Sequence, residues 1–130
     1  AEQAGRVVAT ELIGAFSAEH GAAATRTALA LPEPPTAIIA GGNQILIGCL
    51  EALRAAGIRP GAGISLITCD DVPLSALHEP PIASIGRDTV GLGRTAAELL
   101  VHRLTGDAGP ETVVLPTTFT PRPSCAPPAR

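Results

Sequence analysis

Two consecutive units of strand followed by helix are the feature that most constrains how this chain can fold. The first unit, residues 37–57, reads AIIAGGNQILIGCLEALRAAG, and the second, residues 64–101, begins with ISLITCDD. Apolar residues recur at helical spacing after Asn43, and residues 64–69 are the most strand-like run of the chain. Apolar strands that alternate with helices suit a parallel sheet buried on both faces. The sequence therefore predicts an α/β fold, a three-layer α/β/α sandwich with a mainly parallel sheet.

Further elements are expected on either side of these two units. A helix is predicted to follow Ser17 as its N-cap and to run to Leu31, where prolines follow, and another helix covers residues 91–104. The apolar stripe of this last helix is formed by Leu92, Ala96, Leu99, Leu100 and Leu104. The end of a helix is expected at residues 1–5, and short strands are expected at residues 12–16, 82–85 and 113–119.

Polar residues stand directly after the two central strands of this prediction. Asn43 follows the turn Gly41–Gly42, and Asp70 and Asp71 follow the strand at 64–69. Open α/β sheets bind ligands outside the carboxyl ends of their strands, so Asn43 and Asp70 lie where a ligand is expected. An ionised carboxylate only accepts hydrogen bonds and therefore suits a ligand rich in hydroxyl donors. Structural alternatives stay open: Asn43 as a helix N-cap, Asp70 as the cap of the next turn, and Asp71 in an Asx turn.

The charge distribution does not indicate a nucleic-acid-binding surface in this chain. The nine basic residues are all arginines, scattered singly along the sequence, and the formal net charge is −3. Nucleic-acid binding requires a basic patch, and base stacking requires more aromatic rings than Phe16 and Phe119 supply. The longest apolar run is far too short to span a membrane, so no membrane partner is expected.

Cysteine and histidine usage predicts neither a disulfide framework nor a metal site. The three cysteines lack CxxC spacing, and Cys49 and Cys69 fall on apolar elements, which favours a reduced, cytoplasmic setting. The three histidines have no metal-ligand spacing, and no cofactor is predicted. The chain contains no Met and begins without the pattern of a signal peptide, so we expect that residue 1 is not the natural start.

Over most of its length the chain resembles the effector-binding half of lactose-repressor-type (LacI/GalR) transcription regulators. The resemblance is carried by an ordered series of segments at matching spacing rather than by any single motif. It extends from about residue 11 to residue 124. The segments that carry it are PEPPTAI at 32–38, the run from Ala37 to Asp71, Glu79–Pro81, Leu92–Leu100, Leu115–Thr117 and Arg122–Ser124.

This resemblance implies one lobe of a type I periplasmic-binding-protein-like fold. Residues 1–124 would be an incomplete C-terminal lobe and residues 125–130 an irregular Pro-rich tail, with the DNA-binding head and the first lobe outside this chain. The implied function is that of a cytoplasmic transcriptional regulator, of the repressor type and without catalytic activity. It would bind a small-molecule effector, such as a sugar, and thereby change its affinity for operator DNA. The helix at 44–56 and the segment after Asp71 resemble dimerisation surfaces, so a homodimer is expected.

The resemblance also implies roles for residues near the strand ends. Asp70 matches the first Asp of the pair that hydrogen-bonds the effector, and Asn43 falls on an Asn or Asp of these regulators. Phe16 aligns with an aromatic residue that stacks on the effector ring, with core packing as the alternative. The chain departs from the pattern at Gly42, where these regulators usually have Asn, so the set of sugar contacts is expected to differ here.

Two candidate residues follow the third strand of the central region. Arg87 stands where these regulators usually have Gln, and it either pairs with an anionic effector or lies solvated on the surface. Thr89 occupies a position that is aromatic in some relatives, which favours a small or differently held effector.

Two other functions compete with that of a regulator. A solute-binding protein for sugar transport shares the fold, but the cysteine pattern and the close match at Asp70–Asp71 disfavour it. An enzyme could use the same two carboxylates for metal-assisted phosphoryl chemistry. The sequence, however, contains neither a GxxxxGKS/T phosphate loop nor a nucleophile–base pair.

Overall fold

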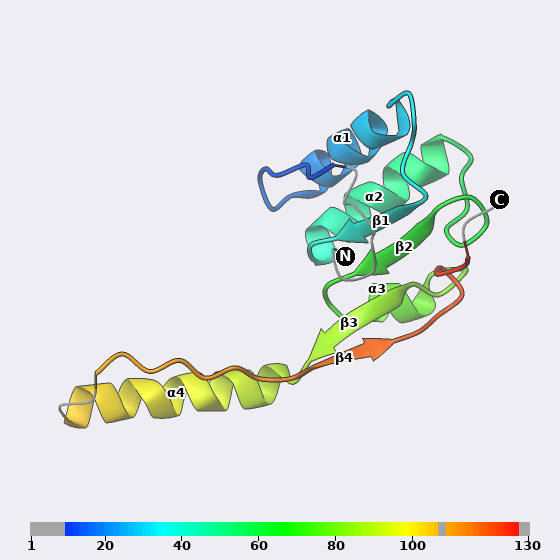
Figure 1. Cartoon of the computed structure of the whole chain (residues 1–130). Coiled ribbons are helices and arrows are strands. Elements are labelled where there is room, and N and C mark those ends of the chain that lie inside the picture. Colours follow the sequence, from blue (N-terminus) through cyan, green and yellow to red (C-terminus); the bar gives the residue numbers. More distant parts are fainter. Residues whose placement is uncertain (1–9, 107–108, 128–130) are drawn as a thin grey trace.

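The computed structural model describes residues 10–106 and 109–127 of the chain (Figure 1). Helices and strands alternate throughout these residues. Their order is α1 (Ala18–Leu29), β1 (Ala37–Ala40), α2 (Asn43–Ala55), β2 (Ser65–Thr68), α3 (Pro73–Leu77), β3 (Ala83–Arg87), α4 (Thr89–Thr105) and β4 (Thr117–Thr120). The alternation of strand and helix predicted for residues 37–101 is therefore confirmed.

The strands form one sheet in the order β1-β2-β3-β4. β2 pairs in parallel with both β1 and β3, whereas β4 runs antiparallel to β3. The registers place Ala40 opposite Thr68, and Thr68 opposite Ser84, so the three parallel strands end at the same edge of the sheet. This is the mainly parallel α/β sheet that the sequence predicts. It brings together the segments that follow β1, β2 and β3.

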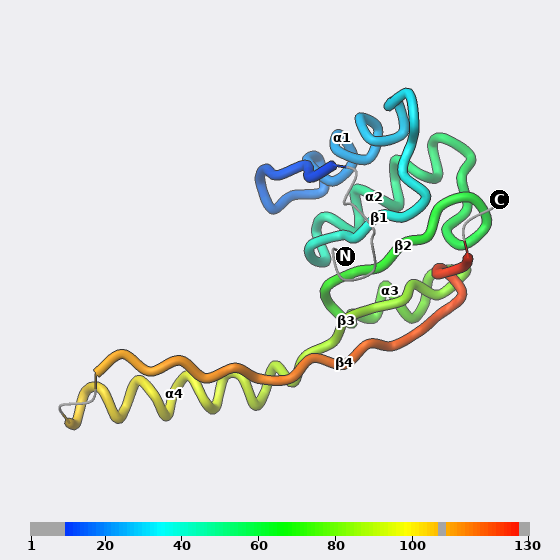
Figure 2. The backbone as a smooth tube through the Cα atoms, in the orientation of Figure 1, coloured from blue at the N-terminus to red at the C-terminus, as the bar shows by residue number. Residues whose placement is uncertain are grey.

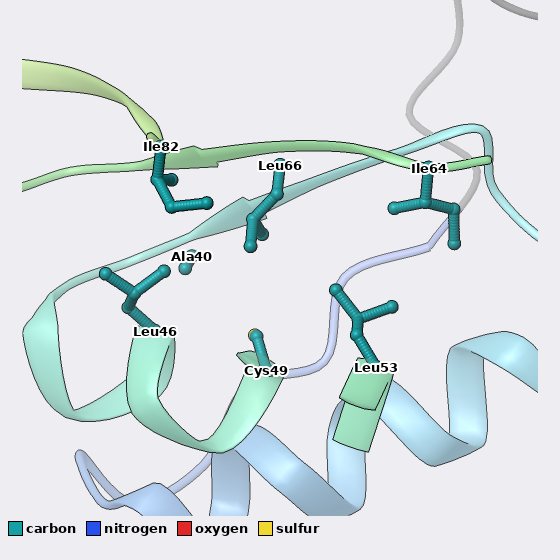
Figure 3. Close-up of a cluster of buried hydrophobic side chains, with 7 residues drawn as sticks. All are labelled: Ala40, Leu46, Cys49, Leu53, Ile64, Leu66 and Ile82. Carbon is teal, nitrogen blue, oxygen red and sulfur yellow. The ribbon is translucent and has the colours of Figure 1, made fainter. Parts of the chain in front are cut away.

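The main hydrophobic core lies between α2 and one face of the sheet (Figure 3). Leu46, Cys49 and Leu53 of α2 point toward the apolar side chains of the strands and the segments beside them. The cluster consists of Ala40, Leu46, Cys49, Leu53, Ile64, Leu66 and Ile82. Each of the larger side chains stabilises the fold by about 1.5–3 kcal/mol when it is fully buried. The predicted apolar stripe after Asn43 is confirmed, and Cys49 packs as a small hydrophobic residue.

Local signals set the ends of α1 and α2. Ser17 is the N-cap of α1, as predicted, and its Oγ accepts a hydrogen bond from the His20 N–H at 3.2 Å. At the end of α2, Gly57 has a φ of 69°, and the N–H of Ile58 donates to the carbonyl of Leu53 at 2.9 Å. This is a Schellman motif, which requires a left-handed residue that glycine supplies without steric cost.

Residues 12–16 do not form the strand that their apolar sequence predicts. A strand exists only when its backbone groups pair, and among the described residues β1 is the edge of the sheet with β2 as its one partner. The segment instead runs irregularly before α1, and Ile13 is 88% exposed. The expectation of a strand here is therefore wrong.

α4 extends away from the sheet rather than packing on it (Figure 2). None of its side chains is buried among the described residues, and Leu100 and Leu104 of the predicted apolar stripe are 58% and 77% exposed. The chain returns alongside the helix, since Leu100 and Glu111 line the same hollow. The predicted strand at 113–119 is consequently shorter in the structure, because residues 113–116 lie outside the sheet and only β4 pairs with β3.

Two further sequence expectations concern the N-terminus and membrane-spanning helices. The helix end expected at residues 1–5 lies outside the described residues. Of the helices that the structure does describe, none combines the length and apolar character needed to cross a membrane.

Candidate functional site

Asp70 and Arg87 meet at the edge where the parallel strands end. Asp70 follows β2, and Arg87 is the last residue of the neighbouring strand β3. The Nη2 of Arg87 donates to Oδ1 of Asp70 at 2.6 Å. The Arg87 side chain is 52% exposed and that of Asp70 only 23%, so the guanidinium is the outer partner of the pair. The two candidates are therefore in direct contact, and Asp70 pairs with β3 rather than capping the turn that follows it.

Phe16 lies against Gly42, which is also close to Asp70. A Cβ atom added to Gly42 would lie 2.5 Å from Cε2 of Phe16 and 3.3 Å from Oδ2 of Asp70. The phenyl ring thus occupies the space that a side chain at position 42 would need. A larger residue at position 42 would therefore require this exposed ring to move. Phe16 is 62% exposed, so its ring is not part of the core.

Asn43 and Thr89 contribute less directly to this arrangement. Gly42 is the N-cap of α2, so the expectation that Asn43 caps this helix is wrong by one residue. The Oδ1 of Asn43 instead accepts a hydrogen bond from the adjacent Gln44 N–H at 2.7 Å. Thr89 is exposed at the start of α4, and within the described part of the chain no hydrogen bond links its side chain to Asp70, Arg87 or Asn43.

A second carboxylate–guanidinium pair, formed by Asp71 and Arg122, holds the loop after β2. The Nη1 of Arg122 lies 2.9 Å from Oδ1 of Asp71 and 2.8 Å from the carbonyl oxygen of Ile82. The hydroxyls of Ser75 and Ser84 are each 3.2 Å from the same nitrogen. The pKa of Asp71 is lowered chiefly by the hydrogen bond from Arg122. Burial is the next largest effect and opposes this shift, while the hydroxyls of Ser84 and Ser75 add smaller effects that lower the pKa.

Asp71 therefore holds the loop through the side chains of Arg122 and Ser75, and among the described residues no backbone N–H donates to it as the Asx turn considered in the sequence would require. Its Oδ1 also accepts a hydrogen bond from the Ser75 hydroxyl at 3.0 Å. Two residues after Arg122, the buried Ser124 donates from Oγ to the Leu66 carbonyl at 2.6 Å and accepts from the Ala83 N–H at 2.7 Å. The segment after β4 is thereby attached to both β2 and β3.

Sequence reasoning missed the role of Arg122 and of the serines around it. The segment Arg122–Ser124 was notable only for its resemblance to the end of the LacI/GalR pattern. Because β4 is antiparallel, the residues after it start from the edge opposite to the one that carries Asp70. Only the length of the arginine side chain lets Arg122 reach Asp71, and strand order alone does not show this. Residues 10–106 and 109–127 contain no group of three or more His, Cys, Asp or Glu that could hold a metal ion.

The sequence is similar to a family of periplasmic binding protein-like domains and to transcriptional repressors. Residues 1–125 match the sequence family described as the periplasmic binding protein-like domain. The HTH-type transcriptional repressor MelR of Bacillus subtilis (strain 168) is 30% identical over 114 residues, which is 88% of this chain and 33% of that protein. The chain spans about a third of the length of the curated relatives it matches.

Solved structures match the fold over most of the chain. A transcriptional regulator LacI from Bacillus cereus subsp. cytotoxis has a TM-score of 0.85 and 28% identity, covering 95% of this chain and 45% of that one. The crystal structure of the Lac repressor dimer bound to operator and the anti-inducer ONPF has a TM-score of 0.74 and 31% identity. That match covers 85% of this chain and 34% of the repressor.

Proposed function

The chain belongs to the family of periplasmic binding protein-like domains, in the form found in LacI/GalR-type regulators, and from this membership we propose that it binds the effector of a transcriptional repressor. The observation that carries the proposal is the meeting of Asp70, Arg87 and Phe16 at the carboxyl edge of the parallel strands. In this proposal residues 1–124 form part of the effector-binding lobe. The effector is bound and released unchanged.

The chemistry of the three side chains supports a polyhydroxylated ligand such as a sugar. The carboxylate of Asp70 can accept hydrogen bonds from ligand hydroxyls, and Oδ2 is not the oxygen that Arg87 contacts. The exposed ring of Phe16 offers a flat apolar surface of the kind on which a sugar face packs. Asn43 stands at the neighbouring strand end, and Thr89 at the start of α4.

The regulatory step in this proposal is a shift between two conformations. An effector that binds one arrangement more tightly increases its population and so changes the affinity for operator DNA. In this proposal the DNA contact belongs to a part of the regulator outside this chain, in which the arginines are scattered singly along the sequence. A regulator of this kind acts in the cytoplasm.

The proposal includes a homodimer formed through α2 and α3. Ile47 and Leu50 of α2 line one groove together with Leu74 of α3, and Leu77 at the end of α3 is 83% exposed. These are the two segments that resemble dimerisation surfaces in the sequence. One of the solved structures that the chain resembles is described as a dimer.

Replacing Asp70 tests the location of the site. The intact protein is titrated with a panel of neutral and acidic sugars by calorimetry, as wild type, Asp70→Asn and the control Glu33→Gln. Glu33 is an exposed carboxylate between α1 and β1. Loss of a charged hydrogen-bond acceptor is expected to weaken binding by roughly tenfold to a hundredfold in Asp70→Asn and to leave Glu33→Gln unchanged.

The outcomes of this experiment separate the competing functions. Unchanged binding in Asp70→Asn would place the ligand elsewhere. Operator DNA binding that responds to the same ligand supports the regulator. Ligand binding without any effect on DNA binding would favour a solute-binding protein for transport.

A further inference from the structure

Arg87 is the outermost charged group of the candidate site. One of its nitrogens contacts Asp70, and within the described residues no other hydrogen bond of this guanidinium is found. A guanidinium carries five N–H donors in a rigid planar fork, so most of the donors of Arg87 remain available. With 52% of its side chain exposed, these donors are accessible to a ligand that enters from solvent.

The carboxylates near this edge are already engaged by other groups. Asp71 is paired with Arg122, whose side chain is only 16% exposed and has several acceptors within reach. Asp88 is the N-cap of α4, and its Oδ1 accepts from the Gly91 N–H at 2.9 Å. Asp70 lies behind Arg87 and orients it. Arg87 is therefore the exposed cation at the ends of β2 and β3, although Asp70 and Asp88 beside it keep their own negative charges.

We propose that Arg87 determines ligand specificity and selects an effector that carries an oxyanion, either a carboxylate or a phosphate. This inference rests on the proposed function and adds the chemical class of the ligand. The fork of a guanidinium matches two oxygens of a carboxylate or phosphate with two parallel hydrogen bonds. A neighbouring hydroxyl of the ligand donates to Asp70, and an apolar face packs on Phe16. The class that fits is an acidic sugar: a sugar acid or a sugar phosphate.

The positive charge of Arg87 is what distinguishes the proposed site from a site for neutral sugars. The guanidinium carries a positive charge at every accessible pH, whereas an amide side chain such as that of Gln would carry none. The hydroxyl oxygens of a neutral sugar can accept hydrogen bonds from Arg87, but they carry no negative charge to pair with the guanidinium. An oxyanion replaces water with hydrogen bonds in which both partners are charged, and it can accept two of them side by side from the guanidinium fork.

The test uses ligands that differ only in their charged group. The intact protein is titrated with D-glucose, D-glucuronate and D-glucose 6-phosphate, and with the corresponding galactose series. The Nε–H signal of Arg87 is followed by nitrogen NMR in the same samples and with inorganic phosphate and acetate alone. The variants are Arg87→Gln, Arg87→Lys and the control Arg94→Gln, an exposed arginine on α4.

The expected result is that at least one oxyanion series shifts the Arg87 signal and binds at least tenfold more tightly than its neutral counterpart. Arg87→Gln removes this preference, Arg87→Lys retains part of it, and Arg94→Gln leaves it intact. The carboxylate and phosphate arms show which oxyanion is selected. The inference is overturned if no oxyanion probe shifts the Arg87 signal, or if neutral sugars bind as tightly as the acids. If a neutral sugar binds and Asp70→Asn abolishes that binding, the proposed function stands while the assignment of Arg87 fails.

Discussion

Two arginines contact two adjacent carboxylates, and burial gives them different roles. Arg87 pairs with Asp70 through one hydrogen bond and is 52% exposed, so a ligand can replace water around it. Arg122 pairs with Asp71, is 16% exposed, and also contacts a backbone carbonyl and two hydroxyls. A group with that many partners cannot leave them without exposing unsatisfied polar atoms. Arg122 is therefore part of the scaffold that positions the ligand-facing pair.

Replacing Arg122 with Gln is expected to destabilise the fold substantially. The change removes the charge opposite Asp71 and weakens the contacts to Ile82 and Ser84. Because Asp71 is 38% exposed, solvent screens part of this loss, and the free energy of unfolding should fall by about 2 kcal/mol rather than the larger cost of a fully buried pair. Urea unfolding at pH 7 measures it, with Arg94→Gln as the control that should change by less than about 0.5 kcal/mol.

The same variant should alter how stability depends on pH. The pKa of Asp71 is lowered in the folded protein, chiefly by the hydrogen bond from Arg122. A lowered folded pKa stabilises the protein above the unfolded value, near 3.8, and this contribution is lost as the pH falls through the lower folded pKa. Glu19 also has a lowered pKa, through hydrogen bonds at the start of α1, and it contributes acid sensitivity to both proteins.

The pH dependence of the difference between wild type and Arg122→Gln isolates the part due to Asp71. Urea midpoints measured from pH 7 down to pH 2.5 should move closer together at the acid end, because the ion-pair part of the wild-type advantage is lost once Asp71 is protonated, while the contacts to Ile82 and Ser84 remain. A constant difference across this range would show that Arg122 stabilises the fold without acting on Asp71.

At the scale of elements, α1 and α2 pack closely because glycines stand at their contact. A Cβ atom added to Gly48 would overlap the backbone of Ala18 and lie 2.5 Å from the Ala22 nitrogen. A Cβ atom at Gly21 would lie 2.5 Å from the carbonyl oxygen of Ile45. Both neighbours are backbone atoms, which cannot move away as a flexible side chain can. The close approach matters for the site, because α1 follows Phe16 directly and α2 begins beside Gly42.

Replacing Gly48 with Ala is therefore expected to lower the free energy of unfolding by about 2 kcal/mol, although alanine is the better helix former. Gly93 of α4 is the matched control, since no atom lies within 4 Å of an added Cβ there. In this chain Gly93→Ala should raise stability by up to about 1 kcal/mol through helix propensity alone. Thermal unfolding of both variants measures the effect. Equal stabilisation by the two substitutions would show that the helices can separate without cost.

At the scale of the whole molecule, two of the regions with exposed apolar residues lie away from the candidate site. One is the groove between α2 and α3, which includes Leu50 and Leu74. The other is α4 with the segment beside it, where Val101 and Val114 are 54% and 88% exposed. Exposed apolar surface of this extent is typical of regions that contact other protein. The proposed homodimer uses the first of these surfaces.

Replacing Leu77 with Glu should therefore dissociate the dimer of the intact protein. A two-fold interface contains every substituted residue twice, so each dimer would bury two additional carboxylates. The dissociation constant should rise by roughly a hundredfold or more. Sedimentation velocity across a concentration series measures this, with Thr27→Glu on the exposed side of α1 as the control. A dimer as stable as the wild type would rule out the α2–α3 groove as the interface.

Features that depend on neighbouring residues could be predicted from the sequence alone. The spacing of Leu46, Cys49 and Leu53 predicts the buried face of α2, and Ser17 predicts the start of α1. Gly57 predicts the helix end at which it is found. The order of strands and helices was also predictable, because strands that alternate with helices pair in parallel. That order places Asp70 and Arg87 at one edge, although 17 residues separate them in the chain.

The tertiary structure decided which of these surfaces and side chains meet. Residues 12–16 have the composition of a strand but lack a partner, and α4 has an apolar stripe that finds no sheet to cover within the described residues. Arg122 and Asp71 are 51 residues apart in the sequence, and they meet because the antiparallel strand β4 returns the chain alongside β3. Periodicity and caps act within a few residues and can be read locally. The partner of a side chain depends on the packing of the entire chain, so only the folded structure shows it.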